Sequence, residues 1–125
     1  VIFYAGPCPA KPGYIIGSIA PTTSIRMDGF LEMCYGLGVS ATIGKGGRSD
    51  RAALLCKQYK RVYFLGFGGV AALMVRQVKK CTVLAYEDLD SESIKALLME
   101  KIRLVVGIDS EGRVFEREQI EKYKR

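Results

Sequence analysis

Short blocks of hydrophobic residues alternate with polar residues along this chain, and glycine, proline or small polar residues separate the blocks. Short apolar runs predict strands over residues 1–5, 14–16, 39–43, 61–65, 81–86 and 104–108, with residues 114–115 closing a hairpin. Apolar residues spaced three and four apart predict a helix over residues 27–36. Further helices are predicted over residues 50–59, after Ser49 or Asp50 as N-cap, over residues 70–79, and over residues 90–99, with Asp90 or Ser91 as N-cap. The residues after 115 are polar, and we expect them to be frayed.

The order of these elements predicts the fold class. Strands and helices alternate through the middle of the chain, while two strands stand at its start and a hairpin at its end. This order is typical of an α/β fold with a mainly parallel central sheet, flanked by helices and extra strands. The sequence contains 125 residues without a repeat or a visible domain boundary, so we expect a single domain over residues 1–125. It contains no apolar run of the roughly 20 residues that cross a bilayer, and we expect no membrane partner.

The net charge narrows the class of ligand. Lys and Arg number 19 and Asp and Glu 13, which gives a formal charge of +6. The basic residues are scattered and are not interleaved with aromatic residues as in RNA-recognition modules. A charge that attracts small anionic substrates fits at least as well as nucleic-acid binding. We therefore expect no nucleic-acid partner, and a basic anion- or nucleic-acid-binding module stays the alternative from another functional class.

The four cysteines give no sign of a local metal site. Cys8, Cys34, Cys56 and Cys81 lie 22 to 26 residues apart, which excludes the close spacing of zinc and ferredoxin-like motifs. Cys34 and Cys56 fall on apolar helix faces, so we predict buried free thiols there. Free thiols favour a reducing compartment, and we expect a cytoplasmic protein whose chain binds no metal.

Two glycine-rich turns carry the candidate chemistry. Residues 17–28 place two threonines and Arg26 where a helix is predicted to begin. A cation is unfavourable at that end of the helix dipole, so Arg26 indicates an anion nearby. Residues 44–49 join a predicted strand to a helix and carry Lys45 and Arg48. Free backbone N–H groups and the helix dipole favour an anion at this second turn as well.

The ligand expected at these turns is a small dianion rather than a nucleotide. Gly38 lies one residue too far from Gly44 for a phosphate loop, and Gly46 stands where that loop has its magnesium-binding Ser or Thr. A guanidinium is a natural bidentate clamp for a carboxylate. The chain contains no histidine, so a proton transfer here would need another base.

Taken in order, the motifs resemble the C-terminal domain of class I fumarate hydratases and the beta subunits of two-subunit fumarases and L-tartrate dehydratases. The segments that carry the resemblance are Ala5-Gly6-Pro7, Gly17-Ser18, Ala20-Pro21-Thr22-Thr23, Arg26-Met27-Asp28, Gly44-Lys45-Gly46-Gly47-Arg48-Ser49 and Leu65-Gly66-Phe67-Gly68-Gly69-Val70-Ala71-Ala72. Ala20 and Gly47 stand where the family usually has Gly and Asn. The family's arginine-bearing segment upstream of Ala5 has no counterpart, so we expect that an N-terminal segment is missing. The fold implied is a swivelling β/β/α domain.

The resemblance implies reversible hydration of fumarate to (S)-malate, with an L-tartrate dehydratase beta subunit as the close alternative. It implies that Thr22 is the base that removes a proton from the substrate carbon, with Lys45 beside it as a catalytic cation. Substrate binding is implied for Thr23, Arg26, Lys45 and Arg48. An oxygen-sensitive 4Fe-4S cluster is implied on three cysteines of an alpha subunit, not on this chain. The assembly implied is a hetero-oligomer, for example of two alpha and two beta subunits, that is active only when complete.

Overall fold

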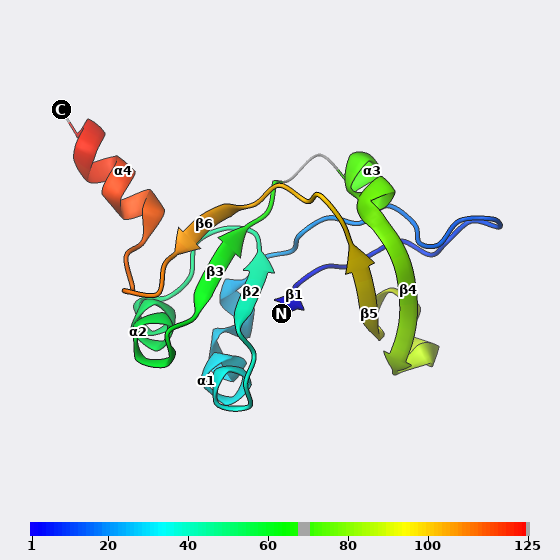
Figure 1. Ribbon diagram of the computed structural model, residues 1–125, viewed down its shortest axis with the longest axis horizontal. Coiled ribbons are helices and arrows are strands. Elements are labelled where there is room, and N and C mark those ends of the chain that lie inside the picture. Colours follow the sequence, from blue (N-terminus) through cyan, green and yellow to red (C-terminus); the bar gives the residue numbers. More distant parts are fainter. Residues whose placement is uncertain (68–70, 125) are drawn as a thin grey trace. The chain divides into compact units, whose positions relative to one another are not determined.

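The structure is a computed structural model that describes residues 1–67 and 71–124 (Figure 1). The elements follow in this order: β1 (Ile2–Phe3), the 3-10 helix η1 (Ile25–Met27), α1 (Asp28–Gly36), β2 (Ala41–Gly44), α2 (Asp50–Tyr59), β3 (Val62–Leu65), α3 (Ala71–Met74), η2 (Val75–Gln77), β4 (Val78–Ala85), η3 (Glu87–Glu92), β5 (Ile94–Met99), β6 (Val105–Ile108) and α4 (Phe115–Tyr123). The chain divides into two compact units. The first comprises Val1–Tyr4, Thr22–Gly66 and Leu104–Arg125, and the second comprises Ala5–Pro21 and Phe67–Arg103. That the two units fold as one domain stays a prediction.

The first unit contains a mixed sheet with the strand order β1-β2-β3-β6 (Figure 1). β1, β2 and β3 run parallel to one another, whereas β6 is antiparallel to β3. The predicted α/β class with a mainly parallel sheet is therefore confirmed. Because the parallel strands point the same way, Tyr4, Gly44 and Leu65 lie at or just beyond their carboxyl ends. We call this end of the parallel strands the carboxyl edge.

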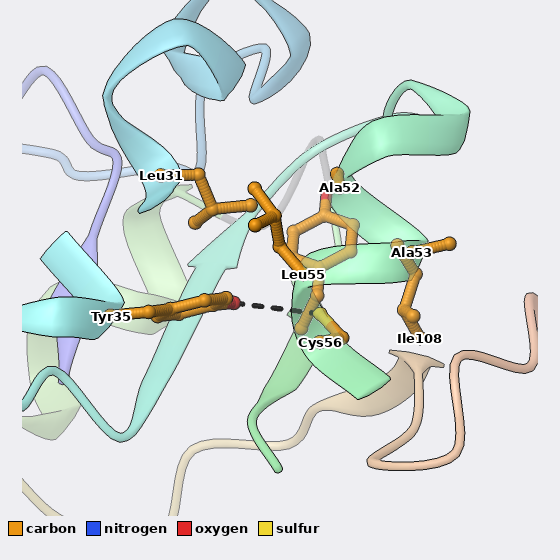
Figure 2. Packing of buried hydrophobic residues seen from close by; sticks show 8 residues of the cluster. Leu31, Tyr35, Ala52, Ala53, Leu55, Cys56 and Ile108 are labelled. Atoms are coloured by element: carbon orange, nitrogen blue, oxygen red, sulfur yellow. Dashed lines mark hydrogen bonds between the residues drawn. The ribbon is translucent and has the colours of Figure 1, made fainter. Parts of the chain in front are cut away.

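The core of the first unit lies where α1 and α2 pack on the sheet. Figure 2 shows Leu31 and Tyr35 of α1 beside Leu55 and Cys56 of α2. The Tyr35 hydroxyl lies 3.6 Å from the Cys56 Sγ, and burial raises the pKa of this thiol. Cys56 is the buried free thiol that the sequence predicts, whereas Cys34 is only half-buried.

The helix predicted over residues 50–59 is confirmed at both ends. Its N-cap is Ser49, whose Oγ accepts a hydrogen bond from the Ala52 N–H at 3.3 Å. The helix predicted over residues 27–36 is also present, as η1 followed by α1. Phe30 belongs to the apolar spacing that predicts this helix but is 56% exposed, because the side of α1 that packs on α2 carries Leu31 and Tyr35.

The end of the chain differs from the prediction. Residues 115–123 form α4 rather than a frayed tail, and an ion pair between Arg117 and Asp50 connects α4 to the start of α2. The predicted hairpin is reduced to a single antiparallel bridge between Ile108 and Val114. α4 is mostly charged and buries no residue, and its few apolar residues, Phe115, Ile120 and Tyr123, give too weak a pattern to reveal the helix.

The second unit contains β4 and β5 as an antiparallel pair. The strand predicted over residues 81–86 is confirmed within β4 as far as Ala85, but the helix predicted over residues 90–99 is wrong. That segment forms η3 and then β5, in which exposed and half-buried residues alternate because pairing with β4 outweighs the helix preference of the sequence. The strand predicted over residues 14–16 is also wrong, since the chain bends there.

The helix predicted over residues 70–79 is shorter than expected. α3 and η2 end at Gln77, and β4 begins at Val78. Residue 70 of this prediction, and Gly68-Gly69-Val70 of the Leu65–Ala72 motif, lie outside the described residues. Within the part of the chain that the structure describes, no helix combines the length and the apolar character needed to cross a membrane.

Two glycines at the end of α1 allow a test of the backbone geometry. A Cβ at Gly36 or at Gly38 would have no heavy atom within 4 Å, but Gly38 alone has a positive φ, of 100°. We expect Gly36→Ala to stabilise the chain by about 0.5 kcal/mol, because alanine restricts the unfolded chain. We expect Gly38→Ala to destabilise it by about 1 kcal/mol or more, because L side chains are strained at such a φ. Urea unfolding measures both, and equal effects of the two substitutions would contradict this account.

Candidate active site

The Thr22–Ser24 segment is hydrogen-bonded to the ends of β1 and β2. The Thr22 N–H donates to the Tyr4 carbonyl at 2.7 Å, and the Thr22 carbonyl accepts from the Lys45 N–H at 2.9 Å. The Ser24 N–H donates to the Lys45 carbonyl at 3.1 Å. These bonds make Thr23 and Lys45 partners in a parallel bridge. The two turns singled out in the sequence are therefore joined by their backbones.

This pairing brings exposed polar groups to the carboxyl edge. Thr23 and Lys45 are both exposed, and as bridge partners they extend from the same face of the ladder. Arg26 is exposed as well and follows shortly after, in η1, whereas Thr22 is half-buried. Ligands of open α/β sheets bind outside the carboxyl ends of the strands. Thr23 and Lys45 thus lie together at the edge where a ligand is expected, and the places of the Thr22 hydroxyl and of Arg26 in this site stay predictions.

Arg48 differs from the other site candidates because its side chain is wholly buried. The Nε donates to Asp28 Oδ1 at 2.6 Å, and Nη1 donates to Thr42 Oγ1 at 3.0 Å. The Nη2 makes longer bonds to the Tyr4 hydroxyl at 3.4 Å and to the Ser24 carbonyl at 3.5 Å. Each nitrogen of this guanidinium therefore bonds a group of the protein itself. A substrate contact by Arg48 stays a prediction.

Two tyrosine rings complete the surroundings of Arg48. Its guanidinium carbon lies 5.2 Å from the ring centroid of Tyr4 and 5.1 Å from that of Tyr63. Burial by itself lowers the pKa of Arg48, but the hydrogen bonds to Tyr4 and Asp28 outweigh burial and raise this pKa overall. Arg48 is therefore a permanently charged group inside the first unit.

The turn that carries Lys45 depends on contacts that the sequence did not reveal. Ser24 is fully buried, and a Cβ on Gly44 would lie 1.7 Å from its Oγ, so only glycine fits there. The Tyr63 hydroxyl lies 3.0 Å from the Ser24 Oγ and 2.7 Å from the Gly46 carbonyl oxygen. Gly46 has a φ of 79°, which favours glycine. These residues fix the turn from the buried side.

Comparison with known proteins identifies the family of this chain. Residues 1–119 match the model of the family described as Fumarase C-terminus. The chain belongs to the fumarase C-terminal family. The family resemblance carried by the ordered motifs is thereby confirmed, and the fumarase C-terminal fold supplies both turns of the candidate site.

The relatives of this fumarase C-terminal chain include two fumarate hydratases and a dehydratase subunit. It is 34% identical over 113 residues to fumarate hydratase 2 of Leishmania major, which covers 89% of the chain and 20% of that protein. It is 32% identical over 123 residues to the anaerobic class I fumarate hydratase of Escherichia coli K12, covering 97% of the chain and 22% of that protein. It is 32% identical over 116 residues to the beta subunit of L(+)-tartrate dehydratase from the same organism, covering 89% of the chain and 58% of that subunit. The chain spans about a fifth of the length of these fumarate hydratases.

Proposed function

We propose that this chain is the beta subunit of a class I hydro-lyase that reversibly hydrates fumarate to (S)-malate. The single observation that carries the proposal is the backbone pairing of Thr22–Ser24 with Lys45 at the carboxyl edge. This pairing brings the two threonines and one cation, Lys45, onto neighbouring segments, which supports a site for a four-carbon dianion. The similarity to fumarate hydratases of two organisms supports the same reaction.

In the proposed mechanism the cations bind the carboxylates and a threonine moves the proton. Arg26 and Lys45 hold the two negative charges of the substrate, and Thr23 donates a hydrogen bond from its hydroxyl. During dehydration of malate, Thr22 in its alkoxide form takes the proton from the carbon next to the one whose C–O bond breaks. The hydroxyl leaves as hydroxide and combines with this proton to give water, and hydration reverses both transfers. A threonine hydroxyl is a weak base in water, so it depends on cations nearby to favour its anionic form. The same cations stabilise the charge that develops on the substrate carboxylate when the proton leaves.

The cysteines of this chain do not fit the 4Fe-4S cluster that the resemblance implies. Among residues 1–67 and 71–124, no group of three or more His, Cys, Asp or Glu side chains is placed to hold a metal ion. As the resemblance implies, the proposal assigns the cluster to an alpha subunit, and the proton transfers of the proposed mechanism do not pass through it. The active assembly proposed is a hetero-oligomer of alpha and beta subunits.

A second candidate function is that of an L-tartrate dehydratase beta subunit. The observation that favours it is the similarity to the Escherichia coli subunit, at an identity close to that of the fumarate hydratases. L-tartrate is also a four-carbon dicarboxylate, so the same cations would bind it.

The experiment that tests the proposal is anaerobic co-purification of the chain with the product of the neighbouring gene, followed by assays with fumarate, malate and L-tartrate. Turnover of fumarate and malate supports the first function, and turnover of L-tartrate alone supports the second. No turnover by a complex that carries its cluster overturns both. The isolated chain, reconstituted anaerobically with iron and sulfide, should hold no stoichiometric cluster, and a cluster there would contradict the division between the subunits.

The proposed role of Arg26 leads to a kinetic prediction. Arg26→Met should raise the KM for malate by about tenfold to a hundredfold, because hydrogen bonds to a charged group contribute roughly 1.5–3 kcal/mol. The matched control is Arg51→Met, which removes an exposed arginine that pairs with Glu32 on the surface of the first unit. Steady-state assays of the reconstituted complex measure both variants. A KM that Arg26→Met leaves unchanged would remove Arg26 from the binding site.

A further inference from the structure

We propose that Arg48 is a positioning residue that holds the Thr22–Ser24 segment and the Lys45 turn in place and does not touch the dicarboxylate. The inference deepens the proposed function and rests on it for its kinetic part. Its structural part concerns the chain itself and is independent of any reaction.

The burial and bonding of Arg48 support a role inside the protein. Its side chain is 0% exposed, and each of its three nitrogens already donates to Asp28, Thr42, Tyr4 or Ser24. To reach a ligand, the guanidinium would have to leave Asp28, whose side chain is only 13% exposed. Breaking a buried ion pair in this way is strongly unfavourable.

The partners of Arg48 connect the two turns to each other. Asp28 begins α1, and its second carboxylate oxygen accepts the Ser49 N–H at 2.8 Å, at the N-cap of α2. The Arg48–Asp28 pair therefore joins the starts of both helices. The Ser24 carbonyl, which Arg48 also reaches, belongs to the residue whose N–H donates to Lys45. Displacing Arg48 would loosen the segment on which Thr22 and Lys45 meet.

The charges around Arg48 also support a positioning role. Asp28 neutralises Arg48, so the pair adds little net charge to the carboxyl edge. The two charges of a dicarboxylate are left to Arg26 and Lys45, which are exposed. A lysine at position 48 would keep the charge but could not bond Asp28, Thr42 and Ser24 at once, because only the guanidinium offers a planar fork of donors.

The structural test measures amide hydrogen exchange of the full chain without ligand. In Arg48→Met, and in the double variant Asp28→Asn/Arg48→Met that leaves no buried charge unpaired, the amides of Thr22, Ser24 and Lys45 should exchange at least about tenfold faster. The amides of Leu55 and Cys56 in the core of α2 should keep the rate of the unchanged chain. Arg51→Met is the matched control and should alter none of these rates. Unchanged exchange at Thr22, Ser24 and Lys45 in the folded double variant would overturn the proposal.

The kinetic test separates positioning from direct binding. In the reconstituted complex, Arg48→Met should lower kcat by about tenfold to a hundredfold, because a displaced Thr22 costs rate, and any rise in KM should come together with faster amide exchange at Lys45, which binds the substrate. Arg48→Lys should recover part of kcat together with part of the exchange protection. A large rise in KM with native exchange rates would make Arg48 a substrate contact and overturn the inference. If the unchanged complex hydrates no dicarboxylate, the proposed function fails, while the exchange rates still decide the role of Arg48.

Discussion

Thr22→Ala should lower the turnover number of the reconstituted complex by about 10²- to 10⁴-fold, the usual contribution of a general base. The fold should survive, because the bonds that hold Thr22 to Tyr4 and Lys45 use its backbone N–H and carbonyl, which alanine keeps. The variant thus removes the hydroxyl and leaves the pairing of the two turns. Steady-state assays with malate, together with thermal unfolding of the chain, measure the two effects separately.

Two further variants sharpen this test of Thr22. Thr22→Ser retains a hydroxyl at the same position and should recover a measurable part of kcat. Thr82→Ala makes the same chemical change at an exposed position of β4 and should leave turnover unchanged. If Thr22→Ala turns over malate at a near-normal rate, Thr22 is not the base, whatever its effect on stability.

The parts of the fold that the sequence predicted are those whose signals are local. The helix 50–59 carries its own N-cap in Ser49 and its own apolar face, and it forms where expected. β5 shows the opposite case, because Lys95-Ala96-Leu97-Leu98-Met99 favours a helix by composition and becomes a strand through its pairing with β4. α4 is mostly charged, buries no residue and has no N-cap hydrogen bond, so its own residues distinguished it only weakly from a loop.

In the candidate site as well, local features were predictable from the sequence and long-range contacts were not. Thr22, Thr23, Arg26 and Lys45 could be selected from residue types and glycine-rich spacing, and the structure joins three of them through one parallel bridge and its hydrogen bonds. Burial cannot be read from such spacing, and the sequence grouped Arg48 with the exposed cations for that reason. Its environment comes from Tyr4, Asp28, Thr42 and Tyr63, which lie on four different segments. Only the assembled sheet brings these groups around one guanidinium.

Gly44 affects both the stability of the fold and the geometry of the candidate site. We expect Gly44→Ala to destabilise the chain by about 3 kcal/mol or more, toward the upper end of the cost of overpacking a buried position. A Cβ there would lie 1.7 Å from the Ser24 Oγ, 3.1 Å from the Ser24 Cβ and 3.1 Å from the Tyr4 ring. Turning the Ser24 Oγ away from this Cβ would break its hydrogen bond with the Tyr63 hydroxyl, and moving the whole residue would weaken the bond from its backbone N–H to Lys45. Urea unfolding of the isolated chain measures the loss.

A double variant identifies Ser24 as the cause of the Gly44→Ala effect. Ser24→Ala removes the Oγ and leaves only the two contacts at 3.1 Å, which small shifts can relieve. Ser24→Ala/Gly44→Ala should therefore be more stable than the sum of the single effects predicts, with an interaction energy of at least about 1 kcal/mol. If the changes in the free energy of unfolding are additive, the clash with Ser24 is not the cause of the Gly44→Ala effect. The Ser24 N–H donates to the Lys45 carbonyl, so Gly44→Ala should speed the hydrogen exchange of the amide at position 24, and the double variant should slow it again. The space at Gly44 would thereby be linked to the geometry of the proposed site.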